Sequence, residues 1–146
     1  MTDPFNLQRF LDAQNPVFGE VLDELRRGSK QGHWMWFIFP QLAGLGHSWM
    51  AQKYAISSRA EAEAYFAHPV LGPRLKHCTE LVNAVEGRSL EQVLGSIDAL
   101  KFGSSVTLFD LIAPRPSVFT GALTKYFAGQ ADRRTLDSLL LSHGVR

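Results

Sequence analysis

Residues 30–41 combine aromatic and polar side chains in a way that could form a ligand pocket. Four aromatic rings lie between polar groups placed toward the two ends of the segment, and three of these rings and three polar groups are our candidates for the pocket. These residues are Lys30, His33, Trp34, Trp36, Phe39 and Gln41. Ligand pockets are mostly apolar walls into which a few polar groups converge. We therefore predict that Trp34, Trp36 and Phe39 form an aromatic wall, on which a flat ring such as a nucleobase stacks.

A second stretch, residues 101–107, has the composition of an anion-binding loop. Its sequence is KFGSSVT, and we expect a loop that leads into a helix near Ser104 or Ser105. Gly103 would let the backbone approach a ligand closely, and the free N–H groups of a helix start bind phosphate or carboxylate. Lys101 would supply positive charge. The stretch lacks the residue order of a P-loop, and a plain serine cap beside a surface lysine is the alternative.

His33 is the candidate catalytic residue, because the ordinary pKa of imidazole lies near neutrality and suits a general acid or base. A structural zinc site would need closely spaced Cys and His ligands. No two of the five histidines are three or four residues apart, and neither CxxC nor HExxH occurs. We therefore predict no metal site and no bound cofactor.

Cys78 is the only cysteine, and we predict that it is a small core residue on a helix spanning 70–85. A nucleophilic cysteine needs a base or a helix N-terminus to lower its pKa. The adjacent His77 points about 100° away on a helix and cannot serve as that base. A lone cysteine forms no intrachain disulfide, which fits the reducing cytoplasm.

Neither the N-terminal residues nor the most apolar stretch of the sequence predicts export or insertion in a membrane. The first residues, MTDPFN, lack a basic region followed by an apolar run, so they do not resemble a secretory signal. The most apolar stretch, residues 34–40, is far too short to span a bilayer. We therefore expect a cytoplasmic protein.

The composition predicts one globular domain, which we place at residues 1–146. The chain has 146 residues, 45% of them hydrophobic and 11% aromatic, which is ample material for a core. Its 15 basic and 14 acidic residues leave a net charge of +1. Nucleic-acid binders show a basic excess or stripe, so this balance argues against such a partner. The oligomeric state does not follow from these features.

Capping signals and apolar periodicity predict a mainly α-helical fold with little or no sheet. Two N-terminal helices should follow Pro4 and Pro16, the second ending at Gly28. Further signals are the capping boxes formed by Ser58 with Glu61 and by Ser89 with Gln92. Runs of β-branched residues are few. The later helices are expected near residues 60–67, 70–85, 106–112, 118–127 and 136–141.

Three strings carry a resemblance to a known family: GSKQGHWMWFIFPQLAGLGHS, EAEAYFAHPVLGPRL and LKFGSSVTLF. They resemble the DUF1810 family, an uncharacterised bacterial family of roughly this length, and the similarity covers nearly the whole chain. The resemblance implies a mainly α-helical single domain and no established reaction. Some members carry the label calpastatin, but true calpastatins resemble disordered, charged repeats, unlike this aromatic-rich chain.

The combined hypothesis is that both stretches fold around one cavity that binds a small anionic or nucleotide-like ligand. If the protein is an enzyme, His33 would act as acid and base in hydrolysis or group transfer. The alternative is a non-catalytic protein-interaction domain that docks a partner through residues 33–41. A third interpretation is that residues 33–41 only fill the core.

Overall fold

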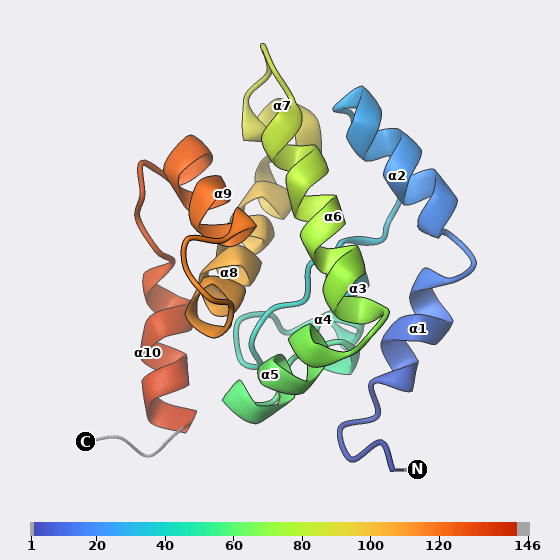
Figure 1. Cartoon of the computed structure of the whole chain (residues 1–146), viewed down its shortest axis with the longest axis vertical. Coiled ribbons are helices and arrows are strands. Elements are labelled where there is room, and N and C mark those ends of the chain that lie inside the picture. Colours follow the sequence, from blue (N-terminus) through green and yellow to red (C-terminus); the bar gives the residue numbers. More distant parts are fainter. Residues whose placement is uncertain (1, 143–146) are drawn as a thin grey trace.

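The protein is built from α-helices, which confirms the predicted fold class. The computed structural model describes residues 2–142, with side chains as far as 140, and in that part of the chain one isolated β-bridge joins Leu42 to Ile56. The helices are α1 Gln8–Gln14, α2 Phe18–Arg27, α3 Met35–Ile38, α4 Trp49–Lys53, α5 Arg59–Ala67, α6 Leu71–Ala84, α7 Leu90–Leu94, α8 Ser96–Ile112, α9 Val118–Phe127 and α10 Arg133–Ser142 (Figure 1). None of the described helices is long and apolar enough to cross a membrane.

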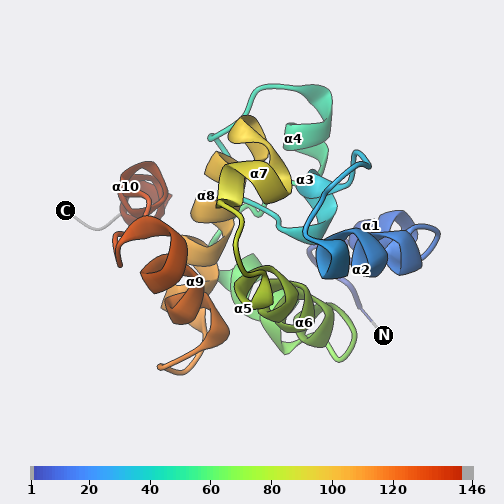
Figure 2. The ribbon, with the colours of Figure 1, turned by 90° about the horizontal axis from the view of Figure 1, so that it is seen from above.

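Helix α8 is the central element, and it packs against α5, α7, α9 and α10 (Figure 2). Every residue from Phe102 to Asp110 is buried. A helix covered on all sides has no polar stripe, so its apolar periodicity is invisible in the sequence. The loop that we expected at residues 103–105 is therefore wrong: these residues are helix interior. Gly103 is a packing residue, because a Cβ there would lie 2.9 Å from the Phe127 ring.

The serine caps that the sequence indicates are present. Ser89 and Gln92 form the capping box that opens α7. Ser58 accepts the N–H of Glu61 at the start of α5, although the Glu61 carboxylate bonds to Ser57 instead of closing the box. Such caps satisfy N–H groups that have no partner within the helix and contribute about 1 kcal/mol each.

The first two helices start later than their proline signals predict. Asp3 accepts the backbone N–H groups of Leu7 and Gln8, so it caps α1 across a turn and the helix begins at Gln8. Helix α2 begins at Phe18 and ends, as predicted, at Gly28, whose φ of 68° is the left-handed conformation that glycine adopts without strain.

Aromatic rings join the helices into one core. Phe10 of α1 meets the edge of Tyr65 of α5, and Tyr65 packs against Phe109 of α8. Phe39, after α3, meets Phe102 of α8 edge to face. All five side chains are fully buried, and each stabilises the fold by about 1.5–3 kcal/mol through the apolar surface it removes from water.

Candidate functional site

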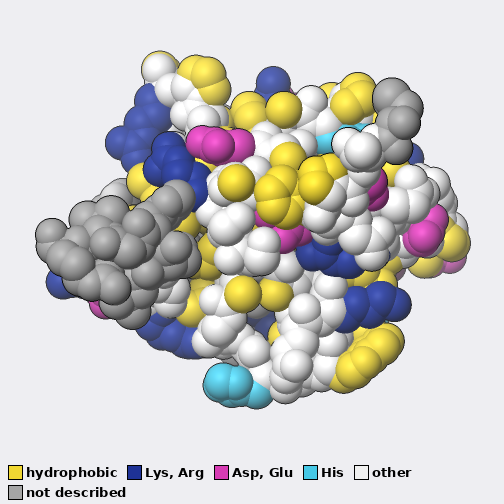
Figure 3. Space-filling view, turned by 90° about the horizontal axis from the view of Figure 1, so that it is seen from below, with side chains coloured by type: hydrophobic (Ala, Val, Ile, Leu, Met, Phe, Trp, Pro, Cys, Tyr) yellow, Lys and Arg dark blue, Asp and Glu magenta, His cyan; other side chains and the backbone are white. Residues whose placement is uncertain are grey.

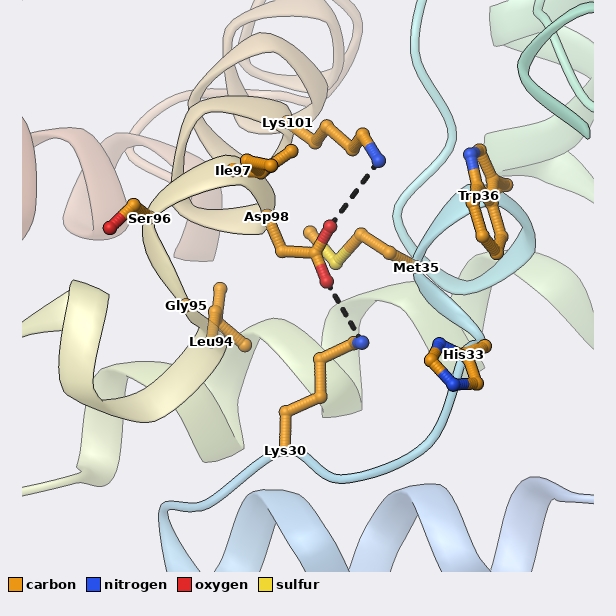
Figure 4. Close-up of a pocket in the computed structure, with 10 residues that line it drawn as sticks. All are labelled: Lys30, His33, Met35, Trp36, Leu94, Gly95, Ser96, Ile97, Asp98 and Lys101. Carbon is orange, nitrogen blue, oxygen red and sulfur yellow. Dashed lines mark ion pairs between the residues drawn. The ribbon is translucent and has the colours of Figure 1, made fainter. Parts of the chain in front are cut away.

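An open cavity of about 470 Å³ lies where residues 30–36 approach the junction of α7 and α8. Figure 4 shows its walls: one comes from the segment before and within α3, the other from the first turn of α8. The lining residues are Lys30, His33, Met35, Trp36, Leu94, Gly95, Ser96, Ile97, Asp98 and Lys101.

Two lysines meet one carboxylate in this cavity. Asp98 lies 2.8 Å from the Lys30 Nζ and 3.4 Å from the Lys101 Nζ (Figure 4). The Lys30 side chain is only 8% exposed and also donates to the carbonyl of Gly32, whereas that of Lys101 is 24% exposed. Lys101 is therefore the lysine more accessible to a ligand.

The start of α8 faces the same cavity. Its N-cap is Gly95, which has no capping side chain. Among the described residues, no acceptor bonds the backbone N–H groups of Ser96, Ile97 and Asp98. A helix start carries about half a positive elementary charge, so it adds to the field of the two lysines.

A buried carboxylate behind the wall fixes residues 31–34. Glu24 Oε1 accepts hydrogen bonds from the N–H groups of Gln31 and Gly32 and from the indole Nε1 of Trp34, at 2.7–2.9 Å. Burial alone would raise the pKa of Glu24, but these three donors outweigh it and hold the pKa below its ordinary value. The carboxylate is therefore ionised and anchors the segment that carries His33.

The two rings that border the cavity differ in how firmly they are held. The Lys101 Nζ lies 4.9 Å from the centroid of the half-buried Trp36 ring, a cation–π contact. His33 is exposed, and within residues 2–142 it has no hydrogen-bond or ion-pair partner. Its ring is therefore available to a ligand but is not oriented by the protein.

A second cavity, of about 550 Å³, adjoins the first. Trp36, Ile97 and Lys101 line both of them. Its remaining wall comes from the segment between α3 and α4, from α4, from α8, and from the start of α10 with the residue before it. These lining residues are Gln41, Leu45, Gly46, His47, Ser48, Ala51, Leu100, Ser104, Asp132 and Arg134.

The structure brings together six of the nine residues that the sequence singled out. Lys30, His33, Trp36 and Lys101 line the first cavity, and Gln41 and Ser104 line the second together with Trp36 and Lys101. These residues come from both stretches of the sequence, so the two stretches do meet around a shared opening.

Trp34, Phe39 and Ser105 lie elsewhere, and for them the predicted placement is corrected. Trp34 is 3% exposed because its indole is held by Glu24, and Phe39 is fully buried against Phe102. Ser105 lies within α8, where its backbone N–H belongs to the helix. The predicted helix start at Ser104 or Ser105 is thus replaced by the real one at Ser96.

Sequence reasoning missed Asp98 and the helix start beside it. The signal was present as GSID at residues 95–98, a glycine and serine followed by an acidic residue in the first turn. It also missed Asp132 and Arg134, which reach the second cavity from the N-terminal flank of α10 and from α10 itself. The signal for Asp132 was its place as an acidic N-cap, since it precedes Arg133 and accepts the N–H of Thr135.

Two predictions about reactive residues can be compared with the described part of the chain. No group of three or more His, Cys, Asp or Glu side chains there could hold a metal ion, and His143 lies outside it. Cys78 is a buried core residue, as predicted, and burial raises the pKa of its thiol to about 12.

The charged side chains on the face shown in Figure 3 are interspersed. Lys and Arg groups lie in separate clusters, with Asp and Glu groups among them.

Comparison with known proteins gives a family but no reaction. The crystal structure of the conserved hypothetical protein Rv1873 from Mycobacterium tuberculosis is 54% identical in sequence and has a TM-score of 0.92, covering 94% of this chain and 98% of its own. No curated protein matches the sequence. A family model described as "protein of unknown function (DUF1810)" matches residues 4–139. Because that match spans nearly the whole chain, this protein belongs to the DUF1810 family.

Proposed function

We propose that this protein binds a small anionic molecule in the first cavity, with the negative group held by Lys101, Lys30 and the start of α8. The observation that carries the proposal is the convergence of these groups, from separate parts of the chain, on one open cavity of about 470 Å³. Small-molecule sites commonly have volumes in this range. The single cysteine supports a reducing, cytoplasmic setting for this activity.

The balance of charge around the cavity favours an anion. Asp98 neutralises part of the field of the two lysines, and Glu24 offsets Lys30 from behind the wall. The two carboxylates equal the two lysines in number, so the positive field that a ligand meets comes from the accessible groups. These are the positive end of α8 and Lys101, whose ammonium can donate three hydrogen bonds and whose ion-pair partner within the described residues is Asp98. A phosphate or carboxylate would accept the hydrogen bonds that the Lys101 ammonium and the first N–H groups of α8 still have to donate.

Trp36 gives the ligand a second recognisable feature. Its ring is half-buried and borders both cavities, so it provides an apolar surface beside the anion site. Rings stack on indole with a favourable contribution of about 1–3 kcal/mol per base. This arrangement favours a ligand that carries a flat ring next to its negative group.

Catalysis by His33 is the second candidate function, and its supporting observation is that His33 lines the cavity that would hold the anion. Hydrolysis or group transfer on the bound molecule would use the imidazole as general acid and base. Catalytic groups are normally oriented by a partner, and His33 has none among the described residues. Binding is therefore the function that the geometry supports best.

The protein-interaction alternative has less support. A docking surface built from residues 33–41 would need exposed aromatic rings in one patch. Trp34 and Phe37 are 3% and 7% exposed, and Phe39 is fully buried. These rings would have to leave the core to reach a partner.

Titration calorimetry with inorganic phosphate and with adenosine 5′-monophosphate tests the proposal. Replacing Lys101 by Ala should weaken binding of both by about tenfold or more, the value of one charged hydrogen bond. Because the side chain is partly exposed, the variant should keep its fold. The matched control is Lys76→Ala, an exposed lysine of α6 that lines neither cavity.

The controls separate the possible results. Absence of binding to the unmodified protein, or equal weakening by Lys76→Ala, would contradict the anion site. His33→Gln distinguishes the two candidate functions: a binding role predicts affinity within about threefold of the wild type, and a catalytic role further predicts loss of turnover of the bound molecule.

A further inference from the structure

We infer that the two cavities are subsites of one elongated site, in which the first takes the phosphate and the second takes the uncharged, hydrogen-bonding half of a nucleoside monophosphate. The inference deepens the proposed function and rests on it. It assigns a ligand class to the second cavity, which the anion-binding argument does not use.

Continuity of the walls is the first argument. Trp36, Ile97 and Lys101 line both cavities, and the Lys101 ammonium lies 4.9 Å from the centre of the Trp36 ring. A molecule that contacts Lys101 from the first cavity therefore already lies at the edge of the second. The side chains of Ile97 and Trp36 would enclose its middle between apolar surfaces.

The polar groups of the second cavity suit a neutral ligand with both donors and acceptors. Within residues 2–142, the side-chain amide of Gln41 has no hydrogen-bond partner. An amide offers a donor and an acceptor side by side, which is how glutamine recognises the edge of a nucleobase. The half-buried Gln41 therefore supplies a ready contact for a base that stacks near Trp36.

Asp132 supplies an acceptor for hydroxyl groups. Its Oδ2 accepts hydrogen bonds from the Ser104 hydroxyl and from the N–H and hydroxyl of Thr135, and these fix the carboxylate in place. Its Oδ1 has no partner among the described residues. A fixed carboxylate oxygen that lines a cavity suits the hydroxyls of a ribose, as in dinucleotide-binding sites.

The second cavity does not favour a second anion. Apart from Lys101, which it shares with the first cavity, its cation is Arg134, which donates to the backbone carbonyl of Leu45 at 2.8 Å, and the Asp132 carboxylate lies in the same wall. A negative group there would face that carboxylate, whereas a neutral group with hydroxyls would bond to it. The charge is thus divided along the site, positive at the start of α8 and balanced near α10.

Calorimetry with three probes tests the division: inorganic phosphate, adenosine 5′-monophosphate and adenosine. The nucleotide should bind about tenfold or more tightly than phosphate, because stacking and hydrogen bonds in the second cavity add to the anion contact. Gln41→Ala should remove about three- to tenfold of the nucleotide affinity and leave phosphate binding unchanged. Gln8→Ala, an exposed glutamine of α1 that lines neither cavity, is the matched control.

Each result decides between the two proposals. If phosphate and nucleotide bind equally tightly, or if Gln41→Ala weakens both alike, the anion site stands and the second subsite is lost. If adenosine binds as tightly as the nucleotide and phosphate does not bind, the proposed anion function fails. If none of the three probes binds, both proposals are overturned.

Discussion

Two clusters of charged side chains in this protein are both built on ion pairs, but they differ in role. The Arg9 cluster joins Arg9 to Glu61 in the first turn of α5. The lysine cluster joins Lys30 and Lys101 to Asp98 beside the cavities. In both, the acidic partner is mostly buried: the Glu61 side chain is 3% exposed and that of Asp98 is 18% exposed. What separates the clusters is how completely their donors are used.

The Arg9 cluster is saturated. The five N–H donors of a guanidinium match five hydrogen bonds: from Nε to the carbonyl of Lys53, from Nη1 to the carbonyls of Phe5 and Asn6, and from Nη2 to Ala55 and Glu61. These bonds join the N-terminal segment, the chain after α4 and helix α5. No donor is left for a ligand, so the cluster is structural.

The lysine cluster is unsaturated and borders open space. Within the described part of the chain, Lys101 has one ion-pair partner, Asp98, and its ammonium otherwise faces the Trp36 ring and the cavities. The comparison teaches that unused hydrogen-bonding capacity next to a cavity, rather than an ion pair as such, distinguishes a binding group from a structural one.

Breaking the saturated cluster should give the largest effect on stability. Glu61→Ala leaves Arg9 without its counter-charge in a mostly buried position, and we expect a loss of about 3–5 kcal/mol in the free energy of unfolding. Urea denaturation measures it. Binding of phosphate by the fraction that remains folded should not change, since Glu61 lines neither cavity.

Glu63→Ala is the control for this loss, because Glu63 lies on the same helix and pairs with Arg59 at the surface, where the two side chains are 57% and 40% exposed. That change should cost less than about 1 kcal/mol. A similar loss in both variants would show that the Arg9 cluster stabilises the fold no more than a surface ion pair does.

Neutralising the carboxylate of the lysine cluster should change ligand affinity, whereas breaking the Arg9 cluster should change stability. Asp98 competes with a bound anion for both lysines, so Asp98→Asn should tighten phosphate binding by about three- to tenfold even as it removes an ion pair from the fold. Calorimetry measures the affinity.

The same measurement on Asp137→Asn provides the comparison, because Asp137 pairs with Arg133 on the exposed face of α10. That variant should bind phosphate as the wild type does. Weaker binding by Asp98→Asn would mean that the carboxylate positions the lysines for the ligand instead of competing with it.

The sequence predicted the helical class and the serine caps of α5 and α7, because caps depend on neighbouring residues. Ser58 and Ser89 both cap their helices, as the local pattern indicates. The predicted loop at residues 103–105 was wrong for two reasons. Gly103 packs against the Phe127 ring of α9, and the Ser104 hydroxyl donates to the carbonyl of Leu100 within the helix. The first contact has no local sequence signature, and the second forms only once residues 100–104 are helical.

Within residues 30–41 the sequence identified the segment but could not separate the wall from the core. Trp34 and Trp36 have the same side chain and lie two positions apart, yet Trp34 is buried and Trp36 borders both cavities. The difference is set by Glu24, which draws the Trp34 indole inward through a hydrogen bond of 2.9 Å. That partner is ten positions away on another helix and does not follow from the string HWMWFIF.

Glu24 allows the most specific test, a pH dependence of stability. Its pKa is lower in the folded protein than the ordinary value of 4.5, so its ionised form stabilises the fold. That stabilisation is fully present above about pH 4.5, the unfolded value, and is lost as the pH falls through the lower folded pKa. Glu24→Gln should cost about 1–2 kcal/mol at pH 7, and the difference from the wild type should shrink as the pH falls below 4.5.

Denaturation at several pH values measures this difference, and Glu86→Gln serves as the control because the Glu86 side chain is 89% exposed. A glutamine at position 24 keeps one oxygen acceptor for the N–H groups of Gln31 and Gly32, so the wall should retain its shape while the charge is lost. Phosphate affinity should then rise slightly, because Lys30 is no longer offset from behind the wall. If affinity instead falls with stability, the carboxylate matters to the site as an anchor of residues 31–34 and its charge is secondary.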